Sequence, residues 1–240
     1  FNTAWYLRQL LPHVPVDYLT AIGTDALSDR LFGFMAAEGI GTGDILRRDD
    51  RTLGLYLIRV ENGERSFSYW RSTSAARTLA DAATPLDHAL EGAGLAYLSG
   101  ITLAILDPAA RDRLLTALAQ ARDNGTRIAF DPNIRPALWS DPDVMRAALM
   151  RAAAGADVVL PSFEDEARWF GDADPQATAR RYQAAGTALV VVKNGPGAVV
   201  TAKGPALTNH PLPGPVAKPV DTTAAGDSFN AGFLAAHLTG

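Results

Sequence analysis

The chain has 240 residues, 48% of them hydrophobic, and a formal net charge of −4. This composition excludes a disordered chain and leaves room for one sizeable α/β domain, while the acidic balance predicts no nucleic-acid partner and no anionic-membrane partner. The chain lacks cysteine, which excludes disulfides and thiolate sites, and it has no apolar run long enough to span a membrane, so we expect a cytoplasmic protein.

Short apolar runs rich in β-branched residues alternate with helical patterns along the chain. This alternation predicts a mostly parallel sheet covered by helices, that is, an α/β fold over residues 1–240 as a single domain. A helix stands directly at each end, so we expect this domain to be truncated at both ends. In chain order, the expected elements are a helix at Asn2–Leu11, a strand at Val16–Ile22, a helix at Asp25–Glu38, a strand at Leu95–Ser99, a helix at Pro108–Asn124, a strand at Arg127–Asp131, a helix at Asp141–Ala154, a strand at Asp157–Pro161, helices at Phe163–Phe170 and Pro175–Ala185, strands at Ala188–Lys193 and Ala198–Ala202, and a helix at Ala225–Leu238.

One segment departs from this alternation and has the pattern of a β-hairpin. Thr52–Val60 and Arg65–Arg71 read as two strands, and Glu61-Asn62-Gly63-Glu64 between them favours a type I′ turn because Asn and Gly tolerate positive φ. The period of two places Tyr69 and Arg71 on one face. We expect the hairpin at about 52–71 to be a small β-lid over a polar ligand. The alternative is an edge hairpin whose aromatic side chains only pack on the core.

A run of small residues leads into the last expected helix, in the segment Asp221-Thr222-Thr223-Ala224-Ala225-Gly226-Asp227-Ser228-Phe229-Asn230-Ala231-Gly232-Phe233. The backbone N–H groups at a helix start point at an anion there, and the helix dipole favours negative charge. Asp227 would lie at the same place and could accept a proton from an attacking hydroxyl group. The alternative is an ordinary helix cap made by Asp227 or Thr223.

This segment resembles the C-terminal signature of the ribokinase-like (PfkB) carbohydrate kinases. The resemblance implies that Asp227 is the catalytic base and that the backbone amides of Ala224, Ala225, Gly226 and Asp227 form an anion hole. Position 224 is alanine where many members have glycine, and we expect this change to be harmless because the role belongs to a backbone amide. The implied fold is a three-layer ribokinase-like sandwich with a mostly parallel sheet and a small β-lid. The implied cofactors are ATP and Mg²⁺, with a monovalent-cation requirement left open.

Further segments resemble the 2-keto-3-deoxygluconate kinases within this family, namely Arg51–Tyr56, Ser68–Arg71, Tyr97–Leu106 and Phe130–Trp139. The resemblance implies substrate contacts from Asn2, Tyr56, Tyr69, Arg71 and Arg135. A guanidinium group binds a carboxylate through two hydrogen bonds, so Arg71 and Arg135 suit a sugar acid. The alternatives are a solvated lid charge for Arg71 and a structural bridge for Arg135.

The nucleotide side is the less specific part of the resemblance. Lys193-Asn194-Gly195-Pro196-Gly197 resembles the family's nucleotide loop but is one residue shorter than the usual Gly-x-x-Gly form, and a plain strand turn is the alternative. Ser162 and Asp165 match an Asn-x-x-Glu motif linked to magnesium through water, with Glu166 as the adjacent alternative. The nucleotide contacts implied are therefore Asn133, Arg135, Ser162, Lys193, Gly195 and Gly197, and the metal-shell candidates are Asp165 and Glu166.

The reaction expected from these residues is ATP-dependent phosphorylation of 2-keto-3-deoxygluconate at its C6 hydroxyl, with Asp227 as the base. One alternative is a kinase of the fructokinase or ribokinase type that acts on a neutral sugar. The other is a sugar-acid-binding regulator that has the same fold without catalysis. The expected partners are the sugar acid and ATP, and a homo-oligomer is left open.

Overall fold

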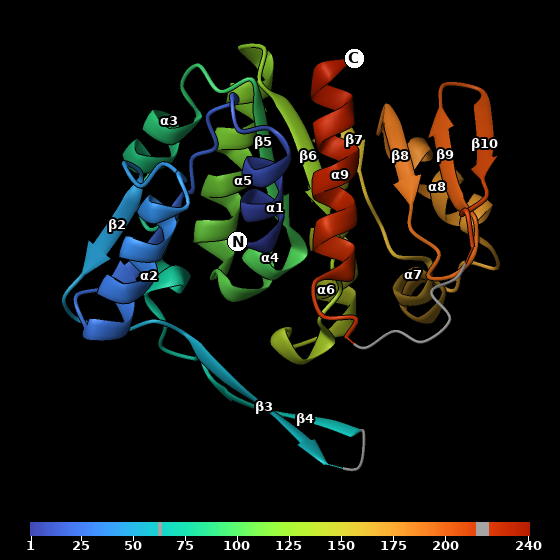
Figure 1. Ribbon diagram of the computed structural model, residues 1–240. Helices are drawn as coiled ribbons and strands as arrows, with labels where there is room; N and C mark the ends of the chain where they lie inside the picture. The colour runs from blue at the N-terminus through green and yellow to red at the C-terminus, as the bar shows by residue number, and fades with distance from the viewer. Residues whose placement is uncertain (62–63, 215–220) are drawn as a thin grey trace. The chain divides into compact units, whose positions relative to one another are not determined.

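The computed structural model describes residues 1–61, 64–214 and 221–240 (Figure 1). They form two compact units, one from Phe1–Ala89, Leu106–Ala110 and Asp227–Gly240, the other from Leu90–Ile105 and Arg111–Gly226.

The strands are β1 (Thr20–Gly23), β2 (Ile45–Arg48), β3 (Leu55–Glu61), β4 (Glu64–Trp70), β5 (Leu95–Ser99), β6 (Arg127–Asp131), β7 (Val158–Val159), β8 (Leu189–Val192), β9 (Val199–Lys203) and β10 (Ala206–His210). The helices are α1 (Asn2–Leu10), α2 (Ala26–Ala37), α3 (Thr84–Leu90), α4 (Gly100–Ile105), α5 (Pro108–Asp123), α6 (Pro142–Ala154), α7 (Phe163–Phe170), α8 (Pro175–Ala184) and α9 (Ala225–Thr239), with short 3₁₀ turns at Ala75–Thr78 and Pro136–Leu138. None of the helices in these residues is both long and apolar enough to cross a membrane. The description as a single domain with an inserted hairpin stays a prediction.

In the first unit, β1 and β2 pair in parallel beside α2 and share an apolar core with it. Asp25 begins α2, because its Oδ1 atom accepts hydrogen bonds from the amides of Leu27 and Ser28 at 3.1 Å each. The core cluster consists of Ile22, Met35, Ile40 and Ile45, with Trp5, Tyr18, Leu31, Phe32 and Leu53 packed against it. Trp5 of α1 and Tyr18 are therefore fixed to the same core.

The hairpin of β3 and β4 confirms the antiparallel pairing that the sequence predicts. Tyr56 and Tyr69 stand directly opposite each other and are 57% and 51% exposed, so these rings do not pack on a core as the alternative required. In Figure 1 the hairpin extends away from α2 and β2 of the same unit. The predicted Asn62-Gly63 turn lies outside the described residues. That the hairpin closes over a ligand stays a prediction.

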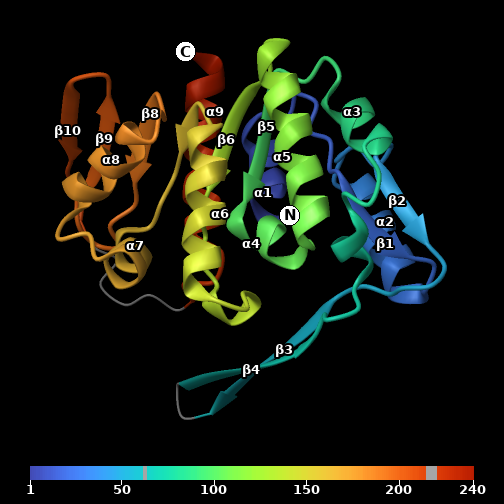
Figure 2. The same cartoon turned by 180° about the vertical axis from the view of Figure 1, so that it is seen from behind.

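The second unit contains a six-stranded sheet in the order β10-β9-β8-β7-β6-β5. Strands β5 to β8 are parallel, whereas β9 is antiparallel to both of its neighbours. Figure 2 shows α5, α6 and α8 on one face of this sheet. The carboxyl ends of the parallel strands lie at the lower end of the sheet in Figure 1, which is the edge where open α/β sheets bind ligands.

Two predicted strands are reduced to short segments of four and two residues in the structure. The strand predicted at Val16–Ile22 begins at Thr20, and before it there is only an isolated bridge between Asp17 and Gly41. The strand predicted at Asp157–Pro161 is reduced to Val158–Val159. At its start the Asp157 carboxylate accepts from the Ile128 amide at 2.8 Å, and at its end Pro161 has no amide to donate. Strands β5 and β6 and helix α7 have the predicted bounds.

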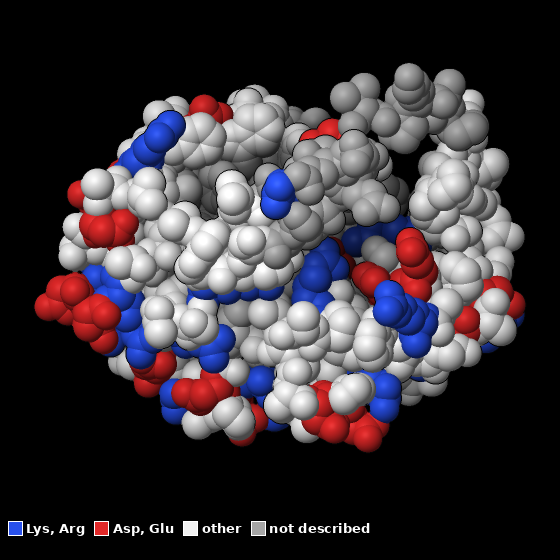
Figure 3. Space-filling view, turned by 90° about the horizontal axis from the view of Figure 1, so that it is seen from below, with Lys and Arg blue, Asp and Glu red and all other residues white. Residues whose placement is uncertain are grey.

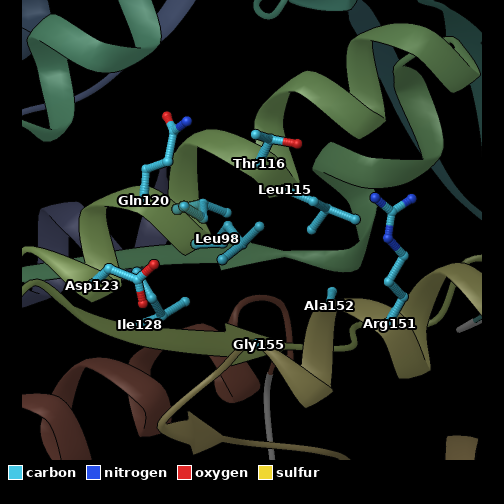
Figure 4. Close-up of a pocket in the computed structure, with 11 residues that line it drawn as sticks. Leu98, Leu115, Thr116, Gln120, Asp123, Ile128, Arg151, Ala152 and Gly155 are labelled. Carbon is cyan, nitrogen blue, oxygen red and sulfur yellow. The ribbon is translucent and has the colours of Figure 1, made fainter.

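A cavity of about 330 Å³ lies among α5, α6 and the sheet of the second unit (Figure 4). Apolar side chains such as Leu98, Leu115 and Ile128 line it, and Arg151 stands beside Ala152 at one end. No residue that the sequence assigns to substrate, nucleotide or metal is among those that line this cavity. The carboxyl ends of the parallel strands, described next, are therefore the better candidate for chemistry in this unit.

Candidate functional site

Asp227 lies in the first turn of α9, and its carboxylate is held by helix α1. The side-chain amide of Asn2 donates a hydrogen bond to Asp227 Oδ2 at 2.9 Å, and the buried Thr3 hydroxyl donates to Oδ1 at 3.5 Å. Burial and, second, the negative charge of Asp227 raise the pKa of Tyr18 to about 12, so this phenol stays neutral near the carboxylate. The fold thus joins residues that are 225 positions apart in the sequence.

This arrangement separates Asp227 from the carboxylates that cap helices. Asp25, Asp141 and Asp174 each precede a helix, and each accepts a hydrogen bond from at least one backbone amide of the following turn. Asp227 instead lies inside α9, and its two oxygens face the side chains of Asn2 and Thr3. Asp227 is therefore not placed as a helix cap, and its role as the base stays a prediction.

The turn before Asp227 has an unusual backbone conformation. Ala224 has a φ of 58°, in the left-handed region that favours glycine. The Ala225 amide donates to the Thr222 carbonyl at 3.2 Å, and the Thr223 amide donates to Asp221 Oδ1 at 2.8 Å. Amides in the first turn of a helix have no carbonyl acceptor within that helix. Of the four predicted anion-hole amides, that of Ala225 therefore has an acceptor within the turn, whereas those of Gly226 and Asp227 belong to the first turn of α9, where the helix itself supplies no acceptor.

The alanine at position 224 carries a conformational cost that the sequence did not reveal, whereas its harmlessness for the amide role stays a prediction. We expect Ala224→Gly to raise the free energy of unfolding by about 1 kcal/mol, because glycine adopts the left-handed conformation without strain. Thermal unfolding should show a gain of roughly 2–4 °C. Ala185→Gly is the matched control, since Ala185 has a φ of −79° at the end of α8 and glycine is unfavourable there. A loss of stability in both variants would contradict the strain at position 224.

Tyr56, Tyr69 and Arg71 form a cluster on one face of the hairpin, as the period of two predicts. The two tyrosine rings are 6.3 Å apart between centroids, and the Arg71 guanidinium carbon is 4.2 Å from the Tyr69 ring centre. A β-carbon at Gly54 would stand 3.0 Å from the Arg71 β-carbon, so glycine lets the two ends of the hairpin approach closely. The cluster presents a guanidinium group stacked on one exposed tyrosine ring, which suits a planar anion such as a carboxylate.

In the second unit, a buried ion pair stands at the carboxyl ends of β6 and β8. The Lys193 ammonium group is 3.1 Å from Asp131 Oδ2, and the two residues are only 8% and 3% exposed. A β-carbon at Gly226 would stand 3.7 Å from Lys193 Nζ, so the ammonium group lies beside the amide turn. Arg135 follows on the loop after β6, where its Nη1 donates to the Ile134 carbonyl at 2.8 Å.

Asp165 completes this group of charges. Burial raises the pKa of Asp165, while the positive charges of Arg135 and Lys193 lower it and the negative charges of Glu164 and Asp131 raise it. Its helix, α7, follows Ser162, which forms a bridge with Lys193. Asp165, Lys193 and Arg135 therefore belong to one electrostatic cluster, as an anionic nucleotide and a cation would require.

The loop after Lys193 makes a tight turn between the antiparallel strands β8 and β9. Gly195 has a φ of 51°, and the Gly197 amide donates to the Asn194 carbonyl at 2.7 Å. Asn133, on the loop after β6, also has a positive φ, of 36°, and its amide donates to Asp131 Oδ1 at 3.1 Å. The geometry is compatible with a nucleotide loop and with a plain turn, so the nucleotide roles of these residues stay predictions.

Glu166, the second metal-shell candidate, has a different task in the structure. Its side chain is 0% exposed, and its two oxygens accept hydrogen bonds from Arg181 Nη2 at 2.6 Å and from the Tyr182 hydroxyl at 3.0 Å. Arg181 also binds Asp172, with Nη2 2.7 Å from Oδ2. Because both carboxylate oxygens of Glu166 accept hydrogen bonds in this network, the structure favours Asp165 over Glu166 for a magnesium water shell, and that role stays a prediction.

The same network predicts a pH dependence of stability. Burial raises the pKa of Glu166 from 4.5 to about 7, despite the opposing charge of Arg181. Between these two values the folded state holds a proton that the unfolded state has lost, so the free energy of unfolding falls as the pH rises through this window, by roughly 3 kcal/mol in total. Denaturant unfolding at pH 5 and pH 8 should show this loss in the wild type and a smaller loss in Glu166→Gln. An equal pH dependence in both proteins would contradict the assignment.

Three residues at these places were not predicted from the sequence, namely Thr3, Tyr18 and Asp131. Thr3 and Tyr18 gave no signal, because neither lies in a motif and both meet Asp227 only through the fold. Asp131 did give one, since a buried strand that ends in a carboxylate marks the ligand-binding edge of the sheet.

On the face shown in Figure 3, basic and acidic side chains are mixed. An anion on this face would therefore be bound by particular groups rather than by a general positive field.

Comparison with known proteins assigns the chain to a family. The model for the pfkB family carbohydrate kinases matches residues 1–240. The 2-dehydro-3-deoxygluconokinases of Dickeya dadantii (strain 3937) and Escherichia coli (strain K12) are 41% and 37% identical over 246 residues each, which is 100% of this chain and 79% and 80% of those proteins. A crystal structure of fructokinase with bound ATP from Xylella fastidiosa has a TM-score of 0.85 at 25% identity, over 99% of this chain and 72% of that one. The ribokinase-like α/β fold expected from the sequence is thus confirmed, and the chain belongs to the pfkB family of carbohydrate kinases.

Proposed function

We propose that the protein transfers the γ-phosphoryl group of ATP to the C6 hydroxyl of 2-keto-3-deoxygluconate. The observation that supports this most is the Asp227 carboxylate, which is held by Asn2 and lies directly after the amide turn at the start of α9. A base beside an anion-binding turn is the pair of groups that phosphoryl transfer to an alcohol needs. The sugar acid is suggested by relatives that are 41% and 37% identical and are named 2-dehydro-3-deoxygluconokinase.

The sugar acid would be bound through its carboxylate and its hydroxyl groups. Arg71, stacked on Tyr69, offers the planar fork that a carboxylate fits, and Arg135 is proposed as the second guanidinium group. Tyr56 and Asn2 are proposed as hydrogen-bond partners of the hydroxyl groups. The Asn2 side chain already bonds Asp227, so it could hold the acceptor hydroxyl and the base in register.

The phosphates of ATP would meet the turn that ends at Gly226 and the ammonium group of Lys193 beside it. Ser162, Asn133 and the Gly195–Gly197 loop are proposed as further nucleotide contacts. Binding of ATP is supported by the family and by the ATP-bound fructokinase of Xylella fastidiosa. Because amides and an ammonium group lie together, this turn suits the charge that develops on a transferring phosphoryl group.

Magnesium is proposed as the accompanying cation, with Asp165 as its outer partner. The fit rests on a carboxylate beside Lys193 and Arg135, in the cluster where phosphates would lie. Within the part of the chain that the structure describes, no three acidic or histidine side chains gather into a protein-only metal cage. This agrees with a cation that keeps several waters and binds mainly to nucleotide phosphates. When bound, magnesium would neutralise charge on those phosphates.

In the proposed reaction, the C6 hydroxyl oxygen attacks the γ-phosphorus of ATP in line with the leaving β,γ-bridging oxygen. The bond from O6 to phosphorus forms as the bond from phosphorus to the bridging oxygen breaks. The hydroxyl proton passes to Asp227, and ADP leaves with the electron pair of the broken bond. The products are the 6-phosphate of the sugar acid and ADP.

One of the two alternatives has specific support, and the other is opposed by the site. The similarity to the fructokinase of Xylella fastidiosa, at 25% identity, supports the alternative of a neutral-sugar kinase. The relatives named 2-dehydro-3-deoxygluconokinase are more similar in sequence, at up to 41% identity. A binding protein without catalysis would need the fold without the base, which the placement of Asp227 opposes. A coupled ADP-release assay over 2-keto-3-deoxygluconate, fructose and ribose distinguishes the three. Faster turnover of the neutral sugars would support the first alternative, and sugar-acid binding without ADP release would support the second.

A further inference from the structure

Asp131 binds two different groups at the carboxyl end of β6, and the proposed function does not yet use it. Its Oδ2 atom is 3.1 Å from the Lys193 ammonium group, and its Oδ1 atom accepts the Asn133 amide at 3.1 Å. The residue is 3% exposed. A carboxylate is costly to bury unless it is paired and hydrogen-bonded, and Asp131 has both kinds of partner at the ligand-binding edge of the sheet.

The first partner places a positive charge beside the phosphoryl-binding turn. Lys193 has a long and flexible side chain, and a buried ammonium group needs a paired acceptor to stay where it is. Asp131 supplies that acceptor, and Lys193 Nζ then stands 3.7 Å from the place of a β-carbon at Gly226. The position of the charge relative to the turn therefore depends on Asp131.

The second partner fixes the loop that leads to Arg135. The Asn133 amide is bound by Asp131, and Asn133 adopts a φ of 36°, which is unusual for a residue with a side chain. Immediately before it, the Pro132 carbonyl oxygen would be 1.9 Å from a β-carbon at Gly100, so the loop packs against the backbone at the start of α4. A loop fixed on both sides in this way holds Arg135 at a defined place two residues later.

We propose that Asp131 is a positioning residue for phosphoryl transfer, which places the Lys193 ammonium group with one oxygen and the loop that presents Arg135 with the other. The proposal rests on the proposed function, since it concerns the phosphoryl group and the sugar acid of that reaction. Beyond that reaction, we propose that this one buried carboxylate positions both Lys193, on the nucleotide side, and the loop of Arg135, on the substrate side.

Asp131→Asn is the first test, because asparagine has the same shape but cannot pair with an ammonium group as a carboxylate does. We expect kcat to fall by about 10- to 100-fold and KM for the sugar acid to rise, while the affinity for ADP, measured by calorimetry, changes by less than about twofold. The matched control is Asp157→Asn. Like Asp131, Asp157 binds one cationic side chain and one backbone amide, here those of Arg122 and Ile128, but it lies at the opposite end of the same sheet. The control should lose stability but keep its kinetic constants.

A double-mutant cycle tests the link to Lys193. Removing one partner of a buried pair is strongly destabilising, whereas replacing both is often close to neutral, so Asp131→Asn with Lys193→Met guards against misfolding of the single variants. If Asp131 acts through Lys193, the double variant has a kcat no lower than that of Lys193→Met alone. A kcat of the double variant that is lowered by the product of the two single losses would overturn this proposal alone. Kinetic constants of Asp131→Asn equal to those of Asp157→Asn would do the same. Absence of turnover in the wild type with every sugar would overturn the proposed function and this proposal with it.

Discussion

Replacing Asp227 by asparagine should lower kcat by about 1,000-fold or more and leave KM for the sugar acid nearly unchanged. Asparagine can still accept the hydrogen bond that the Asn2 side chain donates at 2.9 Å, so the helix start should keep its geometry. What is lost is the group that takes the proton of the attacking hydroxyl. Steady-state kinetics with both substrates, together with thermal unfolding, separates this chemical loss from a loss of structure.

Asp174→Asn is the matched control for that experiment. Asp174 is also a carboxylate at a helix start, and its Oδ1 atom accepts the Ala177 amide at 2.6 Å at the beginning of α8. We expect the control to lose stability by about 1 kcal/mol or less and to keep its turnover, since asparagine is a good cap. A turnover of Asp227→Asn close to that of the wild type would rule out Asp227 as the base.

The second large effect is expected at Arg71. Arg71→Ala should lower kcat/KM for 2-keto-3-deoxygluconate by about 100-fold, because a site that binds a carboxylate by a guanidinium fork loses both hydrogen bonds at once. The neutral sugars have no carboxylate, so their kcat/KM should change little. The substitution also frees the Tyr69 ring, whose centre is now 4.2 Å from the guanidinium carbon.

Arg59→Ala controls for charge and for the hairpin itself. Arg59 pairs with Ser66 and belongs to the opposite face of the hairpin from Tyr56 and Tyr69. Arg71→Lys keeps the charge but not the planar fork, and it should recover only part of the lost activity. Equal losses for the sugar acid in Arg59→Ala and Arg71→Ala would show that the effect is electrostatic and not a contact with the carboxylate.

Much of the second unit could be predicted from the sequence, because short runs rich in apolar residues alternate there with helical patterns. Strands β5 and β6 have the predicted bounds, although β5 is only half-buried whereas four of the five residues of β6 are buried. The elements that the sequence analysis missed have weaker patterns. The edge strand β10 is almost entirely exposed, and β2 contains two arginines in four residues. Helix α4 begins with glycine directly after a strand, so its six residues resemble a continuation of that strand.

Parts of the candidate site could be predicted from the sequence where the spacing of the residues alone determines which side chains lie together. The hairpin period placed Tyr69 and Arg71 together, and the structure has them stacked. The choice between Asp165 and Glu166 depended on which way a helix faces its neighbours, and the ion pair of Glu166 with Arg181 favours Asp165. The strain at Ala224 could not be predicted, because the backbone conformation of a turn depends on the elements that it joins.

A competition experiment tests the central proposal most directly. The protein would receive 2-keto-3-deoxygluconate, fructose and ribose at equal concentrations with limiting ATP, and the phosphorylated products would be identified by ³¹P and ¹³C NMR. The product ratio in such a mixture equals the ratio of the kcat/KM values. The proposed function predicts that the 6-phosphate of the sugar acid dominates. A mixture dominated by fructose or ribose phosphates, or ATP left unconsumed, would contradict it.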